Sequence, residues 1–477
     1  MSDAQPPHEK SRGGIRSVIA GHPTAWLITA LALAFVLLGT GAMFLGVSRA
    51  PATSAAVVVP TSVSTAKPAR VQPDTTEPAV RLRTCSVGAA AADPLLGTLA
   101  ASVVDATTGA TLFDRSGTSP QSPAGALQLL TAVTAVVTLG PGATLSTKVV
   151  DGTAPGTIVL VGGGDVTLST SSDSVYTGAP LMSDLASKAM KKYAAAHPGV
   201  PITSVILDST LWDPTDRWNA SWPTSERTDG YQPFITALMV DGDRADPTQL
   251  VSPRGDDPIV RAGQAFAAAA GLTGVTFAPG AATAGSTVLA EVTSQPVSAL
   301  VSQMLMYSDN AIAEMLARSS SLEQGLGGSS GSVQAVVRSA MDGLDMTGTE
   351  ALIIEDGSGE SANNEVPPVF IARLMVKINN GDGGLDVVLD GMPVGGASGD
   401  LAERFRGDNA AAGSATRAKS GWILHERSLA GSVTTADGAA LTFAFYGLGD
   451  AITFDTRESL DTLVAAMYRC GNNLSNN

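Results

Sequence analysis

The stretch "VSALVSQMLMYSDNAIAEMLAR", residues 297–318, decides how the rest of the chain is interpreted. Apolar residues recur at helical spacing on both sides of Ser308, Asp309 and Asn310, which predicts two helices that meet at this triplet. Residues of these types commonly cap helices, so the triplet by itself has a purely structural explanation. Its meaning therefore depends on what lies elsewhere in the chain.

Two later stretches give the triplet a context. They are "DGSG" at 356–359 and "RAKSG" at 417–421, and the second enters a strand-like run. In this order the three stretches resemble the class C low-molecular-mass penicillin-binding proteins, the D-alanyl-D-alanine carboxypeptidase/endopeptidase family. Penicillin-binding proteins share the motifs Ser-x-x-Lys, Ser-Asp-Asn and Lys-Thr-Gly. The resemblance extends over roughly residues 90–475.

The resemblance implies an α/β (α+β) fold of the penicillin-binding and serine β-lactamase type, in which helices flank a mainly antiparallel sheet. It also implies an insert between the first and second motifs. The pattern of strand-like and helical segments changes at 149–292, which fits an inserted α/β domain. The peptidase-like domain would then consist of residues 85–148 and 293–477. "GGGD" at 162–165 is interpreted as a tight turn, because no Gly-Lys-Ser/Thr follows it.

The resemblance also implies roles for single residues. Ser308 would relay a proton to the leaving amine, Asn310 would hold the substrate amide, and Lys419 would supply positive charge. An extended peptide would lie along Ser420, Gly421 and Trp422. The Ser420 hydroxyl would hydrogen-bond the terminal carboxylate of this peptide. The implied ligands are peptidoglycan stem peptides or β-lactam-like molecules, and no cofactor is implied.

The first motif of the set is degenerate. In "SPAGALQLLTA" (122–132), Ser122 suits a helix N-cap and Pro123 the first helical position. On that helix the nucleophile falls at Gly125 and its base at Gln128, one turn apart on a single face. Glycine has no side chain and glutamine is neutral, so neither can support acyl transfer. Loss of the nucleophile in such hydrolases lowers turnover by roughly 10⁶, which is about 8 kcal/mol of barrier.

Three functional hypotheses remain open. The protein is a non-catalytic relative that binds wall peptides, a working carboxypeptidase with a relocated nucleophile, or a structural partner of cell-wall enzymes. "STAK" at 64–67 matches the first motif literally, but it lies between Pro60 and Pro68, where no helix can align its serine and lysine. The hydroxyl and imidazole groups nearest the motifs belong to Ser122, Thr131 and His425, and we do not expect any of them to replace the missing nucleophile or base.

The N-terminal region predicts export. Residues 24–47 carry no charge and are long enough to cross a hydrocarbon core about 30 Å thick. Basic residues precede this segment, so the tail at 1–23 is expected in the cytoplasm. The alternative is a cleaved secretory signal. The Pro/Ala/Thr-rich segment 48–84 is expected to be a tether, which makes this a single-pass protein of the cell membrane with an extracytoplasmic body.

Charge and cysteine content narrow the possible partners. Lys and Arg total 29 against 44 Asp and Glu, a net charge of −15, so a nucleic-acid partner is not expected. Cys85 and Cys470 are expected to form a disulfide in an oxidising compartment, worth about 5 kcal/mol in the chain-entropy model. The alternative is two unpaired buried thiols. The four histidines are scattered, so no metal site is expected.

Overall fold

The structure is a computed structural model that describes residues 82–476. The predicted cytoplasmic tail, the predicted membrane anchor and nearly all of the predicted tether lie outside the described residues, as does the "STAK" stretch. Within 82–476, no helix combines the length and the apolar character needed to cross a membrane.

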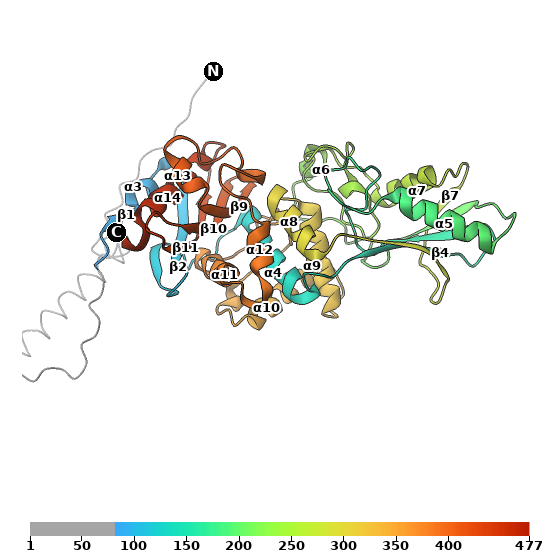
Figure 1. Ribbon diagram of the computed structural model, residues 1–477, viewed down its shortest axis with the longest axis horizontal. Helices are drawn as coiled ribbons and strands as arrows, with labels where there is room; N and C mark the ends of the chain where they lie inside the picture. The colour runs from blue at the N-terminus through green and yellow to red at the C-terminus, as the bar shows by residue number, and fades with distance from the viewer. Residues whose placement is uncertain (1–81, 477) are drawn as a thin grey trace, which may run out of the picture. The chain divides into compact units, whose positions relative to one another are not determined.

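An antiparallel sheet carries the last motif. Its strands β9 (Thr416–Ile423), β10 (Glu426–Thr434) and β11 (Ala440–Leu448) follow one another in the order β11-β10-β9. The hairpin of β2 (Thr98–Asp105) and β3 (Thr111–Arg115) is placed with β2 beside β11 (Figure 1). The predicted mixture of helices and a mainly antiparallel sheet in this domain is therefore confirmed.

Both faces of this sheet are buried. Successive side chains of a strand point to opposite sides, so β10 and β11 each contribute to two separate cores. One face packs on α14 (Thr456–Cys470) and the other on a cluster that includes α11 (Pro368–Asn380). The alternation is plain in β10 and β11: the α14 side takes Leu429, Phe443 and Phe445, and the α11 side takes Ala430, Ala444 and Tyr446.

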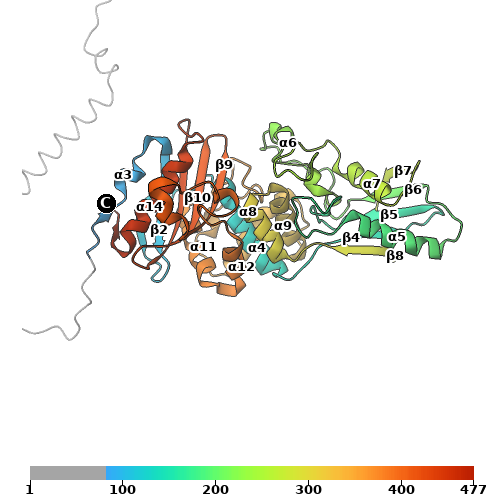
Figure 2. The same cartoon turned by 45° about the horizontal axis from the view of Figure 1, so that its top comes forward.

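The first-motif helix lies at the centre of a group of helices. Helix α4 (Gln128–Leu139) contacts α8 (Val297–Tyr307), α9 (Asn310–Glu323) and α10 (Val333–Gly343), and Figures 1 and 2 both show α8 and α9 next to it. All of α4 except its last turn is buried, including the polar residues Gln128, Thr131 and Thr134. The remaining short helices are α3 (Gly88–Ala91), α6 (Ser225–Asp229), α12 (Asp386–Gly391) and α13 (Ala410–Gly413).

A second sheet occupies the region predicted as an insert. Its order is β7-β6-β5-β4-β8, with β5, β6 and β7 parallel and β4 antiparallel to both of its neighbours. Helices α5 (Met182–Ala196) and α7 (Pro258–Ala269) contact each other and share one apolar core with the strands (Figure 2). The strands are β4 (Ser146–Asp151), β5 (Thr157–Val161), β6 (Ser204–Asp208), β7 (Thr276–Pro279) and β8 (Val288–Thr293).

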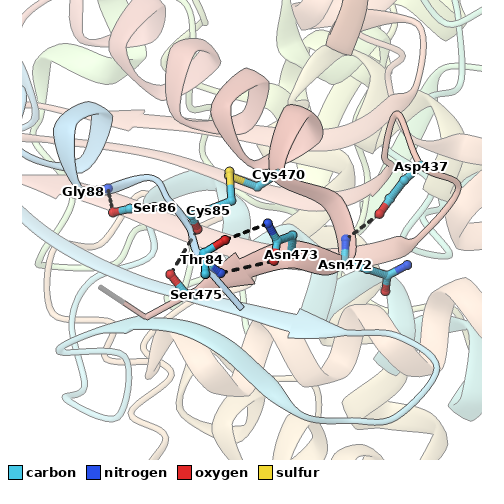
Figure 3. Close-up of a disulfide and its surroundings, with 9 residues drawn as sticks. All are labelled: Thr84, Cys85, Ser86, Gly88, Asp437, Cys470, Asn472, Asn473 and Ser475. Carbon is cyan, nitrogen blue, oxygen red and sulfur yellow. Dashed lines mark hydrogen bonds between the residues drawn. A yellow bond between two sulfur atoms is a disulfide. The ribbon is translucent and has the colours of Figure 1, made fainter. Parts of the chain in front are cut away.

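A disulfide joins the two ends of the described chain, which confirms the predicted pairing. Cys85 and Cys470 are bonded across 385 residues of sequence (Figure 3). Beside the bond, β1 (Cys85–Ser86) pairs in parallel with β12 (Leu474–Ser475). The Ser475 hydroxyl donates to the Cys85 carbonyl at 3.1 Å. The covalent link and the short strand pair therefore hold both ends at one place.

Candidate active site

Ser308 and Lys419 meet in the structure. Lys419 lies on β9 and is fully buried, and its Nζ donates to Ser308 Oγ at 2.8 Å and to the Ser420 carbonyl. Ser308 ends α8 in a left-handed conformation, with φ of 55°, and Asp309 caps α9 by accepting the Ile312 N–H at 3.0 Å. The prediction that two helices meet at this triplet is confirmed.

Gly125 approaches the same place from the first-motif segment. A Cβ atom at Gly125 would lie 3.5 Å from Lys419 Nζ and 3.1 Å from both Gly421 Cα and the Ser420 carbonyl oxygen. The position expected for the nucleophile is therefore next to the lysine of the third motif. It carries no atom that could attack a carbonyl group.

The start of the first-motif helix differs from the prediction. A 3₁₀ turn at Ala124–Leu127 precedes α4, and its flanking residue is Pro123 rather than Ser122. Ala124 has a positive φ of 44°, which a regular α-helical turn cannot include. The Ser122 hydroxyl is 3.5 Å from the Ala124 N–H and caps no helix. The predictions of an N-cap at Ser122 and of a helix that begins at Pro123 are thus wrong, because the 3₁₀ turn begins at Ala124 and α4 begins only at Gln128.

Gln128 stands at the position expected for the base and is fully buried. Its Nε2 donates to Asn310 Oδ1 at 3.2 Å and to the Ser358 carbonyl at 3.3 Å. Its Oε1 has no hydrogen-bond partner among the described residues. The side chain therefore links α4 to the helix junction and to the 356–361 loop, but a neutral amide cannot take up a proton.

The loop 356–361, "DGSGES", is organised by the buried Asp356. Its carboxylate accepts the main-chain N–H groups of Gly359 at 2.9 Å and Ser361 at 2.7 Å. The indole N–H of Trp222 donates to the same carboxylate at 2.8 Å. These bonds to one buried carboxylate fix the shape of the loop and tie it to Trp222.

A buried and a half-buried carboxyl group accompany this loop. Glu314 on α9 accepts two main-chain N–H groups of the loop, and burial, assisted by the charge of Asp356, raises its pKa to about 7. Glu360 accepts the side-chain N–H of Asn310 at 3.0 Å, and burial, assisted by Glu226, raises its pKa to about 8. Sequence reasoning missed both residues, although the quoted loop motif pointed to the segment that holds Glu360.

Asp400 stands beside the lysine and the serine of the third motif. Its Oδ2 accepts the Ser420 hydroxyl at 3.3 Å and lies 3.8 Å from Lys419 Nζ. Burial lowers the pKa of Lys419 to about 8, and the charge of Asp400 opposes that shift. Sequence reasoning did not single out Asp400, because only the tertiary structure brings it to β9.

A residue of the inserted region holds the helix junction in place. Arg244 donates to Asp309 Oδ2 at 2.7 Å and to the Tyr176 hydroxyl at 2.7 Å. Both members of the Arg244–Asp309 pair are at most 5% exposed. Burial alone would raise the pKa of Asp309, but Arg244 and Arg254 outweigh it and hold the pKa below its usual range.

The other residues singled out from the sequence lie around the site or away from it. Trp422 is 57% exposed and stacks on the guanidinium of Arg427, 4.5 Å from its ring centre. Thr131 is buried and donates to the Gly357 carbonyl at 2.6 Å. His425 is exposed and lies 3.6 Å from Asp450. No cluster of His, Cys, Asp or Glu within 82–476 could hold a metal ion. The catalytic and binding roles of the motif residues stay predictions.

Comparison with known proteins gives consistent matches. The family described as D-Ala-D-Ala carboxypeptidase 3 (S13) matches residues 84–273 and 251–467. The chain is 32% identical over 475 residues to carboxypeptidase DacB of Mycolicibacterium smegmatis, covering 94% of this chain and 99% of that protein. It is 34% identical over 398 residues to carboxypeptidase Rv3627c of Mycobacterium tuberculosis, covering 81% and 84%. Penicillin-binding protein 4 (dacB) of Haemophilus influenzae has a similar fold, with a TM-score of 0.63 at 17% identity, covering 78% and 95%.

Proposed function

The chain belongs to the D-Ala-D-Ala carboxypeptidase 3 (S13) family, and we propose that it binds the D-Ala-D-Ala region of peptidoglycan stem peptides without cleaving it at a normal rate. The proposed location is the outer surface of the cell membrane, with the described body held there by the N-terminal segment. β-Lactams are expected to enter the same cleft as non-covalent ligands.

The contact between Gly125 and the third motif carries this proposal. A Cβ at Gly125 would be 3.5 Å from Lys419 Nζ, which supports Gly125 as the position of the missing nucleophile. Glycine offers no attacking oxygen there. Gln128 keeps hydrogen bonds to Asn310 and Ser358 but cannot serve as a base. Loss of nucleophile and base is expected to lower turnover by roughly 10⁶, about 8 kcal/mol of barrier.

The residues proposed to bind the ligand lie at accessible positions of the site. The Asn310 side chain is partly exposed and would hold the ligand amide. The β9 residues Gly421 and Trp422 are also accessible and would support an extended peptide through its main chain. Lys419, whose Nζ donates to Ser308 Oγ, would contribute positive charge to the binding site.

Labelling with a fluorescent penicillin, combined with calorimetry, tests the proposal. The expected result is measurable binding of a D-Ala-D-Ala peptide and no stable covalent adduct with the penicillin. A stoichiometric adduct formed within minutes would refute the loss of catalysis. Absence of peptide binding by a folded, disulfide-bonded sample would refute the binding role, and capture of a cell-wall enzyme by that sample would favour a structural role.

One observation favours a second candidate function, a working carboxypeptidase with a relocated nucleophile. The Ser308 hydroxyl is 2.8 Å from Lys419, and burial lowers the pKa of this amine to about 8, so the neutral amine that a Ser-Lys pair needs is accessible near neutral pH. Mass spectrometry of any penicillin adduct distinguishes the two functions. An adduct on Ser308 that disappears in Ser308→Ala would support the second candidate.

A further inference from the structure

We propose that Asp400 makes this cleft select ligands whose C-terminal carbonyl group is neutral, either amide-capped or extended by a further peptide bond, over ligands that end in a free carboxylate. The inference rests on the proposed function, because it concerns which wall peptides the cleft accepts. It assigns a specificity-determining role to a side chain of this chain outside the three motifs.

The carboxylate of Asp400 already uses the groups expected to bind a terminal carboxylate. Its Oδ2 accepts the Ser420 hydroxyl at 3.3 Å, and the same oxygen is 3.8 Å from Lys419 Nζ. Ser420 has a single hydroxyl proton to donate. An incoming carboxylate would therefore compete with Asp400 for that proton and for the charge of Lys419.

The main chain holds Asp400 at this position. It lies in a short 3₁₀ turn, Gly399–Leu401, in which Gly399 has a positive φ of 53° and packs so closely on the main chain of Met306 that a Cβ atom would collide with it. The Leu401 carbonyl accepts the Gly396 N–H at 2.8 Å. The turn is thus fixed against α8, two residues from Ser308.

Neither Gln128 nor Arg404 supplies a counter-charge for a second anion beside the third motif. Gln128 is neutral where the family motif has a lysine, so it supplies none. The nearby guanidinium of Arg404 is buried and bonded to Asp461 at 2.6 Å. Lys419 would have to serve two carboxylates a few ångströms apart, and like charges at such distances repel strongly in a partly buried site.

A neutral C-terminal amide fits the same groups without that repulsion. Its N–H can donate to Asp400, whose side chain is 30% exposed and so is accessible from the protein surface. Its carbonyl oxygen can accept from a donor on β9. Both an amide cap and a further peptide bond present this arrangement, so the shared chemistry is an uncharged acyl-amide end.

The test compares two acetylated D-Ala-D-Ala peptides, one with a free carboxylate and one with a C-terminal amide, by calorimetry on the intact disulfide-bonded protein. Wild type is expected to bind the amide about 10-fold or more tightly than the acid. Asp400→Asn is expected to lose this preference by binding the acid better. The control is Asp408→Asn, which removes an equal charge from an exposed position and should retain the preference.

The outcomes separate this inference from the proposed function. Equal or tighter binding of the acid by wild type would overturn the inference alone. So would an unchanged preference in a folded Asp400→Asn protein, with Asp400→Ser as a second variant should the first fail to fold. Failure of wild type to bind either peptide would overturn both the inference and the proposed function.

Discussion

The double substitution Gly125→Ser with Gln128→Lys would restore the missing first motif. The surroundings of the two positions determine how much folding stability the change would lose. Gly125 does not have a positive φ, so serine meets no backbone strain there. Its Cβ would lie 3.1 Å from Gly421 Cα and from the Ser420 carbonyl oxygen, so strand β9 must shift by a few tenths of an ångström. Overpacking of this kind costs about 1–3 kcal/mol.

The lysine adds a buried charge. Its ammonium would find the two acceptors that Gln128 uses now, Asn310 Oδ1 and the Ser358 carbonyl. The carboxyl of Glu360 lies just beyond, bonded to Asn310 at 3.0 Å, and a neighbouring ammonium would favour its ionised form. Because this pairing offsets part of the desolvation, we expect a total stability loss of about 2–5 kcal/mol for the two changes.

Acylation by a fluorescent penicillin, followed on a denaturing gel, measures the gain. We expect the double variant to be labelled at least ~10³ faster than wild type, which is part of the roughly 10⁶ that a nucleophile and its base supply together. Gly125→Ala with Gln128→Lys is the matched control, because it adds the same Cβ and the same charge without a hydroxyl. A double variant that unfolds cooperatively, keeps its disulfide and still shows no labelling above this control would refute the reasoning.

Three further changes test the surroundings of the site. The pKa of Glu360 is raised from 4.5 to about 8 in the folded state, so the stability that its protonated form contributes is fully present below pH 4.5 and is lost as the pH rises through 8. Glu360→Gln should therefore flatten the fall in melting temperature between these pH values. An unchanged slope would show that the carboxyl is not desolvated as described. Removing the disulfide by Cys85→Ala with Cys470→Ala should lower the unfolding free energy by up to about 5 kcal/mol in denaturant titrations, whereas a change under ~1 kcal/mol would contradict the chain-entropy argument. Arg244→Met leaves the buried carboxylate of Asp309 without its ion-pair partner and should destabilise the protein by about 3–5 kcal/mol. If the unpaired carboxylate is the cause, the double variant Arg244→Met with Asp309→Asn should regain stability. Additive losses of stability in the double variant would oppose this explanation.

Local pattern sufficed for several features. The alternation of β10 and β11 follows from side chains that point to opposite faces of a strand, and the two helices around Ser308 follow from apolar spacing interrupted by capping residues. Chemistry alone predicted that Gly125 and Gln128 cannot attack a carbonyl group or accept a proton. Two cysteines in a chain predicted to be exported were likewise enough to predict their bond.

The sequence could not predict which polar side chains surround the motifs. Asp400 and Arg244 have no recognisable spacing relative to the motifs. Glu360 lies in the quoted 356–361 loop, but nothing in that pattern indicates that its side chain turns toward Asn310. The start of the first-motif helix was also misplaced, because the left-handed conformation of Ala124 is imposed by its surroundings and not by its residue type.

The sequence by itself thus determined the order of elements, the motif residues and the absence of a nucleophile at the expected position, since these depend on residue type and short-range periodicity. Tertiary structure alone decided the electrostatics of the site. A pKa near 8 for Lys419 and for Glu360, and a carboxylate beside Ser420, arise from burial and from charges brought together by folding, and both depend on distances that no linear pattern encodes.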